Sequence, residues 1–500
     1  MTTLYSKTSL AQSPLRLALF LIPLVFAWFA LSPTAQAVSP APDGGYPGGN
    51  TAEGQNALFS LTSGGFNTAV GFFSLRSNAT GQFNTATGAG TLLASTANEN
   101  TATGAAALLS NTTGSDNTAN GAFALFSNTA GGFNTANGDR ALFSNMSGAQ
   151  NTATGISALQ SNTNGSSNTA NGAYALVNNT TGNENTANGM FALFSNTDGS
   201  FNTANGSQAL YSNASGTANT ANGWQALLNN NSVYNTADGF QALYSNTTGQ
   251  FNTATGAHAL LRSITGENNV ANGFEALGSN TTGGANTAIG SLAFTGNSTG
   301  NNNTALGASA GNGVTTANNV ICIGANVPGA NVSNTTWIGG VYGVSTQSGT
   351  TAPVVVSDNG QLGTAASSER FKKDIATMET ASEAIMSLRP VTFHYKTDTK
   401  GTPQFGLIAE EVAKVNPGLV LPDKEGKPYT VRYDQVNAML LNEFLKEHRK
   451  NEQQESKLEE QEVKIARQEQ QIEALAAGLQ KVSAQLELNK PATQTVLNDR

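Results

Sequence analysis

The sequence predicts a mostly β protein: an elongated, trimeric β-solenoid (β-roll) of seventeen-residue repeats, followed by a small α+β module and a C-terminal coiled coil. Three observations support this prediction. The phrase Asn-Thr-Ala, once Asn-Val-Ala, returns in register sixteen times between Asn50 and Asn303, at steps of seventeen residues with two steps of sixteen. Charged residues become dense only after residue 366. Apolar residues then stand seven apart near the C-terminus.

The repeat is too short for a pair of helices, so each unit should form one coil of a solenoid that buries its apolar side against its neighbours. The residue four after each Asn is Gly in all sixteen units, from Gly54 to Gly307, which indicates a corner that a side chain would obstruct. Leu stands eight after the Asn from Leu58 to Leu277, mostly preceded by Ala. These two columns predict the buried stripe, as a second strand or as a helical turn.

Side chains that stack from coil to coil are expected to form ladders in the Asn and Thr columns. Aromatic residues recur just before the Asn, and we expect them to pack the coil or a trimer axis rather than to hold a ligand. They are Phe66, Phe83, Phe133, Phe201, Tyr234 and Phe251. A narrow coil of Ala and Leu buries little apolar area per residue, so burial against sister chains, and hence oligomerisation, is expected.

Charge excludes one class of partner for the repeat region. Between residues 38 and 366 the basic residues are Arg76, Arg140 and Arg262, against eleven acidic residues and no Lys. Such a surface lacks the basic footprint of a nucleic-acid-binding protein, so no nucleic-acid partner is predicted.

The N-terminus predicts export. Lys7 and Arg16 precede an apolar run over residues 17–31, and Ala35-Gln36-Ala37 has the small-x-small pattern of a signal-peptidase site. Residues 1–37 are therefore interpreted as a signal peptide, the alternative being an uncleaved membrane anchor, for which the run is short and interrupted by Pro23. With no later apolar segment of membrane-spanning length, we expect no membrane span after signal removal and a secreted or cell-surface location.

The predicted organisation follows from these changes in composition. The charged segment is predicted to form an α+β module. Its expected elements are two helices at residues 368–386 and 406–415, a strand at 391–395 and a long helix from residue 431. The predicted parts are a signal peptide (1–37), a linker (38–49), the repeats (50–319), a β-rich collar (320–366), the module (367–450), the coiled coil (451–488) and a polar tail (489–500).

The coiled coil is predicted from an apolar heptad seam of Leu458, Ile465, Ile472, Leu479 and Leu486. Leu475 and Val482 occupy companion positions, whereas Gln461 and Gln468 occupy two others, which costs stability and tends to fix the register. Ile on the seam is compatible with three strands, so a homotrimer is favoured weakly by this feature alone.

The charged module resembles a known family through four ordered motifs. They are Ser367-Ser368-Glu369-Arg370-Phe371-Lys372-Lys373-Asp374-Ile375, Leu388-Arg389-Pro390-Val391, Gly406-Leu407-Ile408-Ala409-Glu410-Glu411-Val412, and Tyr433 before the coiled coil. These look like the C-terminal intramolecular chaperone of phage tail spikes, the S74 peptidase family. The resemblance implies a module that trimerises, templates the folding of the β structure ahead of it and then cuts itself off.

In that family the cut is made by a Ser-Lys dyad, which the resemblance carries over to Ser367 and Lys372. Ser368 stands where the family commonly has Asp, so a second hydroxyl competes for the role of nucleophile. A Ser hydroxyl needs a base, and a Lys can serve when burial and cations such as Arg370 favour its neutral form. Spacing alone favours the alternative in which Ser367 is a linker residue and Lys372 a solvated charge, and the family resemblance favours the dyad.

No other site is evident in the sequence. The three His residues, His258, His394 and His448, are far apart, and Cys322 in an apolar stretch reads as a small buried residue. Neither a phosphate-binding loop nor a Cys/His metal pattern occurs, so no cofactor and no metal are predicted.

We interpret the chain as an exported homotrimeric fibre or adhesin-like surface protein, with repeats loosely similar to the heads of trimeric autotransporter adhesins and a cell-surface or polysaccharide ligand. One alternative is a polysaccharide-degrading enzyme resembling the tail-spike enzymes, which would need paired carboxylates, and no such pair is evident among the scattered acids. Others are a permanently trimerised structural protein without cleavage and an ice-binding or crystal-surface solenoid, which a single Thr column supports poorly.

Overall fold

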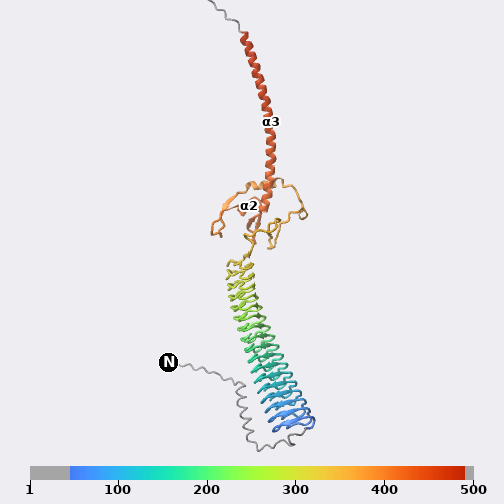
Figure 1. Cartoon of the computed structure of the whole chain (residues 1–500). Helices are drawn as coiled ribbons and strands as arrows, with labels where there is room; N and C mark the ends of the chain where they lie inside the picture. Colours follow the sequence, from blue (N-terminus) through green and yellow to red (C-terminus); the bar gives the residue numbers. More distant parts are fainter. Residues whose placement is uncertain (1–45, 490–500) are drawn as a thin grey trace, which may run out of the picture. The chain divides into compact units, whose positions relative to one another are not determined.

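The computed structural model describes residues 46–489. The predicted signal peptide, most of the linker and nearly all of the polar tail lie outside the described residues. The described residues divide into two compact units, with the division between Gln347 and Ser348. Figure 1 follows the elements of each unit along the sequence.

The first unit is a parallel β-solenoid, and its eighteen short strands form one sheet (Figure 1). Each strand pairs with the strand of the next coil in register, so that Thr lies beside Thr and Ala beside Ala, as in Thr135↔Thr152 and Ala136↔Ala153. The strands are β1 (Thr51–Glu53), β2 (Thr68–Val70), β3 (Thr85–Thr87), β4 (Thr101–Thr103), β5 (Thr118–Asn120), β6 (Thr135–Asn137), β7 (Thr152–Thr154), β8 (Thr169–Asn171), β9 (Thr186–Asn188), β10 (Thr203–Asn205), β11 (Thr220–Asn222), β12 (Thr236–Asp238), β13 (Thr253–Thr255), β14 (Val270–Asn272), β15 (Thr287–Ile289), β16 (Thr304–Leu306), β17 (Ile321–Ile323) and β18 (Thr336–Ile338).

The Gly column forms the corner after each strand, as predicted. Gly155 has φ +126°, and a Cβ there would lie 2.7 Å from the carbonyl carbon of Gly172 in the next coil. Coils stacked this closely leave no room for any side chain at the corner, which explains the unbroken column.

The Ala-Leu segment after the corner is a turn and not a second strand. Its Leu residues take the left-handed conformation, with φ 52° at Leu159. The segment is nevertheless bonded from coil to coil, because the Leu142 N–H donates to the Ala158 carbonyl at 2.9 Å. Ala158 and Leu159 are fully buried, so the predicted apolar stripe is confirmed.

The Asn column forms a continuous buried ladder. The backbone N–H and the side-chain Nδ2 of Asn151 both donate to Oδ1 of Asn134 in the preceding coil, at 3.0 and 3.1 Å. Asn151 Nδ2 also donates to the Gly165 carbonyl of its own coil at 2.9 Å. Every polar group of this buried side chain is thereby satisfied.

The Thr column does not form the ladder that the sequence suggested. Its side chains point away from the core and are exposed or half-buried, whereas the Ala between them and the corner is buried. In the part of the chain that the structure describes, none of the hydroxyls in this column bonds to another protein group. The strand alternation explains the difference, since neighbours of a buried residue face outward.

A second buried Asn ladder stands eleven residues after the first, and sequence analysis missed it. Asn145 Nδ2 donates to Asn128 Oδ1 at 2.7 Å and to the Gly148 carbonyl at 2.8 Å. No Asn–Asn bond can form where Leu61, Ser95, Ser263 or Val314 takes the Asn position. Accordingly, the buried side-chain atoms that lack a partner among residues 46–489 are Asn246 Oδ1, Ser263 Oγ and Asn297 Oδ1.

The sheet continues past the predicted boundary at residue 319. Strands β17 and β18 extend it to Ile338, so the first half of the expected collar belongs to the solenoid. Val320 replaces the repeat Asn, yet its backbone N–H still bonds Asn303 Oδ1 at 2.8 Å. Cys322 replaces the buried Ala and is itself fully buried, as predicted, and this burial raises the pKa of its thiol.

The second unit contains three small antiparallel sheets, short helices and one long helix. Its elements are β19 (Val355–Val356) paired with β20 (Leu362–Gly363), the 3₁₀ helices η1 (Glu369–Phe371) and η2 (Glu379–Ser387), β21 (Val391–Phe393) paired with β22 (Gln404–Gly406), α2 (Ala409–Val415), η3 (Pro417–Leu419), β23 (Val420–Pro422) paired with β24 (Pro428–Val431), and α3 (Tyr433–Leu488). Val412, Leu419, Val431 and Met439 form its small buried core.

Two predicted helices differ from those observed. The stretch 368–386 is two separate 3₁₀ segments, because Asp374 between them adopts φ 55°, which a continuous helix excludes. The stretch 406–415 begins as a strand, with Gly406 paired to Val391, and the helix starts only at Ala409.

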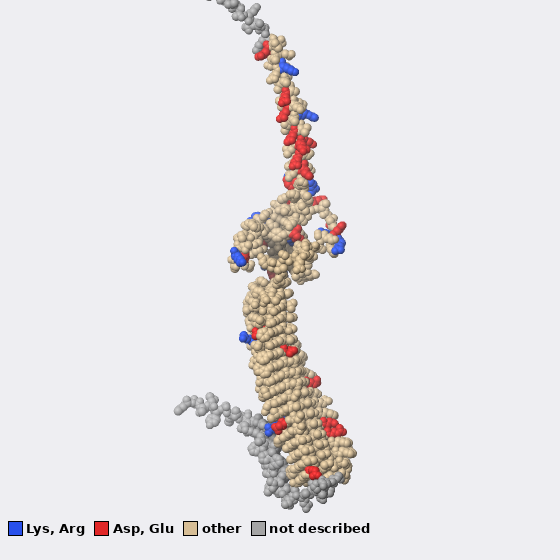
Figure 2. Space-filling view, viewed as in Figure 1, with Lys and Arg blue, Asp and Glu red and all other residues tan. Residues whose placement is uncertain are grey.

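Helix α3 runs unbroken across the predicted boundary between module and coiled coil. The heptad seam is solvent-exposed in the single chain, for example at Ile465 and Ile472. Figure 2 shows charged side chains along this helix and few on the solenoid. Among residues 46–489, no helix has the length and apolar character needed to cross a membrane.

Removing one rung of the first Asn ladder should destabilise the solenoid. In Asn151→Ala, the buried backbone N–H of Asn168 loses its acceptor, at a cost of about 1–3 kcal/mol. Denaturant unfolding of the full chain should therefore show a lower midpoint for this variant. Thr152 directly follows Asn151, and its side chain is exposed. Thr152→Ala should therefore change the unfolding free energy by less than about 0.5 kcal/mol. Equal midpoints for the two variants would contradict a structural role for the ladder.

Candidate functional site

The candidate Ser-Lys pair lies at the start of the second unit's helical segment. Ser367 precedes η1, and Lys372 caps its C-terminal end, with its backbone N–H bonded to the Glu369 carbonyl at 2.9 Å. This single turn folds the Lys side chain back, so that Lys372 Nζ donates a hydrogen bond to Ser367 Oγ at 3.3 Å.

The hydroxyl of Ser368, which competes with that of Ser367 for the role of nucleophile, is not bonded to Lys372. Ser368 is the N-cap residue of η1, and its carbonyl accepts the Phe371 N–H at 3.0 Å, but its side chain makes no capping bond. Of the two Ser residues, the one beside the Lys372 amine is Ser367.

In a single chain the pair is open to solvent. Ser367, Lys372 and the intervening residues are all exposed, and the Arg370 guanidinium lies 4.6 Å from the Phe371 ring centre. General-base catalysis by Lys requires a desolvated amine. A surface that covers this segment would therefore be needed before the pair could react.

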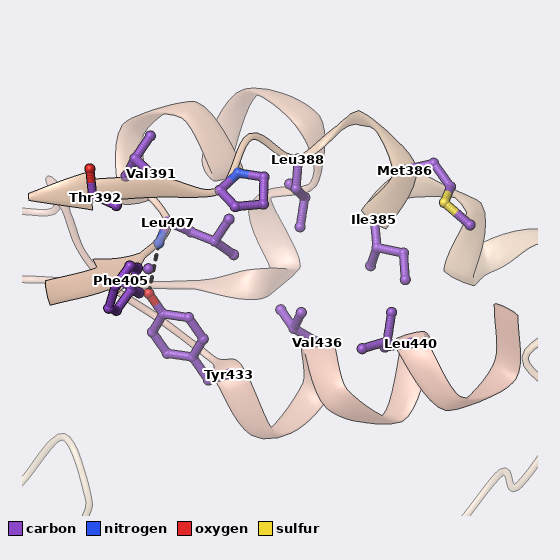
Figure 3. A pocket seen from close by; sticks show the side chains of 12 residues that line it. Ile385, Met386, Leu388, Val391, Thr392, Phe405, Leu407, Tyr433, Val436 and Leu440 are labelled. Atoms are coloured by element: carbon purple, nitrogen blue, oxygen red, sulfur yellow. Dashed lines mark hydrogen bonds between the residues drawn. The ribbon is translucent and has the colours of Figure 1, made fainter. Parts of the chain in front are cut away.

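An apolar groove of about 710 Å³ lies between η2, the β21–β22 hairpin and the start of α3 (Figure 3). Residues from three of the four motifs quoted above line it, including Leu388, Pro390, Leu407 and Tyr433. The Tyr433 hydroxyl accepts the Leu407 N–H at 2.9 Å. A Cβ at Gly406 would lie 2.7 Å from that hydroxyl, which explains the Gly.

An ion pair braces the outside of the same module. Arg389 donates two hydrogen bonds to the Glu411 carboxylate, at 2.6 and 3.1 Å. The hydrogen bonds from Arg389 lower the pKa of Glu411, and those to Glu411 raise the pKa of Arg389. The pair ties the second sequence motif to the third.

A buried polar cluster joins η2 to α3, and it was not predicted because its members lie about sixty residues apart in the chain. Ser382 Oγ is fully buried, accepts from Asn442 Nδ2 at 2.7 Å and donates to the Glu443 carboxylate. Lys446 Nζ bonds the same carboxylate at 2.7 Å. The hydrogen bonds from Lys446 and Ser382 lower the pKa of Glu443.

The solenoid contains a carboxylate pair that the sequence did not reveal. Glu99 and Asp116 occupy the position before the repeat Asn on successive coils, between Phe83 and Phe133 in the same column. A hydrogen bond to Asp116 and the charge of Asp116 raise the pKa of Glu99. Hydrolysis of a sugar chain needs carboxylates at least about 5 Å apart with the glycosidic bond between them, so this directly bonded pair does not fit that chemistry.

Two pairs of aromatic residues in this column stack on one another but remain exposed, whereas Phe133 and Phe201 have no aromatic neighbour in the column. The rings of Phe66 and Phe83 are 5.2 Å apart and nearly parallel, as are those of Tyr234 and Phe251. The predicted packing is thus between neighbouring coils, at the surface. Among the described residues there is no group of three or more side chains suited to hold a metal ion.

Replacing Glu99 by Gln should stabilise the full chain near neutral pH. Because the pKa of Glu99 is raised on folding, the folded state binds its proton more tightly, and wild-type stability rises as pH falls through that pKa. The melting temperature of Glu99→Gln should exceed that of wild type at pH 7, and the difference should shrink in acid. Glu184→Gln, in the same column between Ser167 and Phe201, is the matched control and should give no such pH-dependent gain.

Comparison with known proteins bears on the second unit. No curated protein and no solved structure matches the chain, so the loose similarity of the repeats to autotransporter heads stays a prediction. Residues 367–421, which begin at Ser367 and run to β23, match the family model Peptidase_S74. The family is described as the chaperone of endosialidase, so this part of the chain is similar to that domain and follows a β-solenoid of seventeen-residue repeats.

Proposed function

We propose that the chain is an exported homotrimeric fibre or adhesin-like surface protein, whose C-terminal module drives trimer folding and then separates by cutting its own chain. The observation that carries this proposal is the 3.3 Å approach of Lys372 Nζ to Ser367 Oγ at the first residues of the family match. The solenoid ahead of the module is the kind of elongated β structure that such a module serves.

The proposed reaction is one turnover of acylation of Ser367 followed by hydrolysis of the ester. The unprotonated amine of Lys372 accepts the proton of Ser367 Oγ, and the oxygen attacks the carbonyl carbon of a peptide bond beside it. The carbon–nitrogen bond breaks, and the leaving amine takes the proton back from Lys372. Water then hydrolyses the Ser367 ester, which frees the hydroxyl and completes the cut.

Trimerisation supplies what the single chain lacks. The exposed seam of α3 would be buried between three parallel helices, an arrangement with which its heptad spacing is compatible. Assembly would also bring sister chains around the exposed Ser367–Lys372 segment and exclude water from it. Cleavage would thus follow correct assembly, and the cut would act as a folding checkpoint.

Export is supported by the N-terminal sequence and by the fibre-like family. A signal peptide over residues 1–37 would place the trimer outside the cell or on its surface. A ligand on that surface, such as a polysaccharide, would be bound by the solenoid. The principal alternative is a permanent trimer that never cleaves, with the same fold and the same assembly.

Cleavage is tested by intact mass measurement on the full chain. Wild type should yield a solenoid fragment and a C-terminal fragment with a break beside residue 367. Ser367→Ala and Lys372→Ala should stay whole, a loss of at least about a hundredfold in rate. Ser368→Ala is the matched control and should still be cut. An intact wild type, or a cut that depends on Ser368 and not on Ser367, would contradict the assignment.

Trimerisation is tested by native mass measurement on Ser367→Ala, which keeps the helix attached. This protein should be a trimer, and a second change, Ile472→Asp, should abolish it, because three charges would meet in an apolar seam. Gln470→Asp, two residues away and off the seam, should leave the trimer intact. A trimer that survives Ile472→Asp would show that α3 does not hold the chains together.

A further inference from the structure

The outward side of the solenoid sheet from β3 to β11 is chemically uniform. Each of these nine strands directs two side chains outward, the residues one and three after the repeat Asn, and all eighteen are Thr or Asn. We call this surface the polar sheet face. Its side chains are exposed or half-buried, and none carries a charge.

The polar sheet face is regular in two directions. Parallel in-register pairing, as in Thr152↔Thr169 and Thr154↔Asn171, places equivalent side chains one above another at intervals of about 4.8 Å. The two columns stand two residues apart along each strand, or about 6.6 Å. The buried Asn ladders and the Ala column fix the backbone beneath, so this array is preformed.

The polar groups on this face are available to a ligand. The hydroxyls of the Thr column have no protein partner among the described residues, so each can both donate and accept. In the second column, Asn188 Nδ2 donates to Asn205 Oδ1 at 2.8 Å, and Asn205 Nδ2 donates to Asn222 Oδ1 at 2.9 Å. These amides are held in one orientation, with the second Nδ2 hydrogen of each still free.

Charge selects the kind of partner that fits. A polyanion would find no cation on the face and would meet Glu99, Asp116 and Glu184 in the neighbouring column. A polycation would find no carboxylate among the eighteen outward side chains. The face is therefore complementary to an uncharged ligand that offers many hydroxyl groups at regular intervals.

Exposed aromatic rings adjoin this face. Phe83, Phe133 and Phe201 stand two residues before the Thr of their coils and are more than half exposed. Sugar rings present both hydroxyl groups, which hydrogen-bond to Thr and Asn, and apolar C–H faces, which pack against aromatic rings.

We propose that the polar sheet face binds an uncharged polysaccharide in an extended, ordered array, such as an insoluble neutral glucan or chitin. The proposal rests on the proposed function of a surface fibre and names its ligand class and binding surface. A single contact would be weak, but nine coils in fixed register add their contacts without ordering the protein on binding. Affinity should therefore depend on several coils together.

The test is a depletion assay with the full chain on microcrystalline cellulose, chitin and cross-linked alginate. Wild type should bind cellulose or chitin and not the acidic alginate. Changing Thr135, Thr152, Thr169 and Thr186 together to Ala should weaken binding at least tenfold. The matched control changes Thr113, Thr181, Thr248 and Thr282 to Ala, which are exposed Thr residues of another column, and should bind like wild type.

Several outcomes would overturn the proposal. One is that wild type binds neither neutral polysaccharide, and another is that both quadruple variants bind equally well. A third is a change in native mass in the first variant only, which would show that the face is an interface between copies of the chain. Thermal hysteresis of wild type without polysaccharide binding would assign the face to ice instead. Native mass and cleavage are measured on the same samples. A cleaved trimer that does not bind polysaccharide would refute this inference alone. An uncleaved monomer would refute the proposed function.

Discussion

The buried side-chain amide is the interaction on which the solenoid depends. A coil of seventeen residues encloses little apolar volume, and its interior must also satisfy the backbone groups that face inward. One Asn side chain does this for its own coil through the Gly carbonyl and for the next coil through its Oδ1, as Asn151 does for Gly165 and Asn168. Each Asn depends on the Asn of the preceding coil for a hydrogen-bond acceptor. The residue types of the repeat can therefore vary freely at the surface and hardly at all in the interior.

This dependence explains which features the sequence could predict. The Gly corner recurs in all sixteen units and the Ala-Leu stripe in most of them, because every coil has nearly the same environment. Repetition makes these features and their period visible without a structure. The second ladder was also visible in the sequence as a column of Asn residues, Asn111, Asn128 and Asn145. It was overlooked because the residues beside each of these Asn vary, and because a spacing of eleven residues from the first Asn is not a known motif. The outward direction of the Thr column followed from strand alternation and could have been anticipated.

Other features could not be predicted because they depend on contacts or on unusual backbone. Leu rarely adopts positive φ, so nothing local indicates that Leu159 does. The break between η1 and η2 was not predicted for the same reason, because Asp374 also adopts a positive φ. The Ser382 cluster requires residues about sixty positions apart in the chain to meet. The Glu99–Asp116 contact, by contrast, follows from the register of successive coils and could have been anticipated. The Ser367–Lys372 approach was expected only through family resemblance, since spacing alone does not distinguish a dyad from two solvated residues.

The amide ladders also have a direction. In both ladders Nδ2 points toward the preceding coil and Oδ1 toward the following one, as in Asn151 to Asn134 and Asn145 to Asn128. Their dipoles therefore add along the axis, much as peptide dipoles add along an α-helix. They place partial positive charge at the first coil and partial negative charge at the last coil, in addition to the charges of the side chains. Parallel dipoles placed side by side repel each other. A bundle of such solenoids would prefer antiparallel neighbours, and a separate C-terminal assembly module would be one way to force all chains to run the same way.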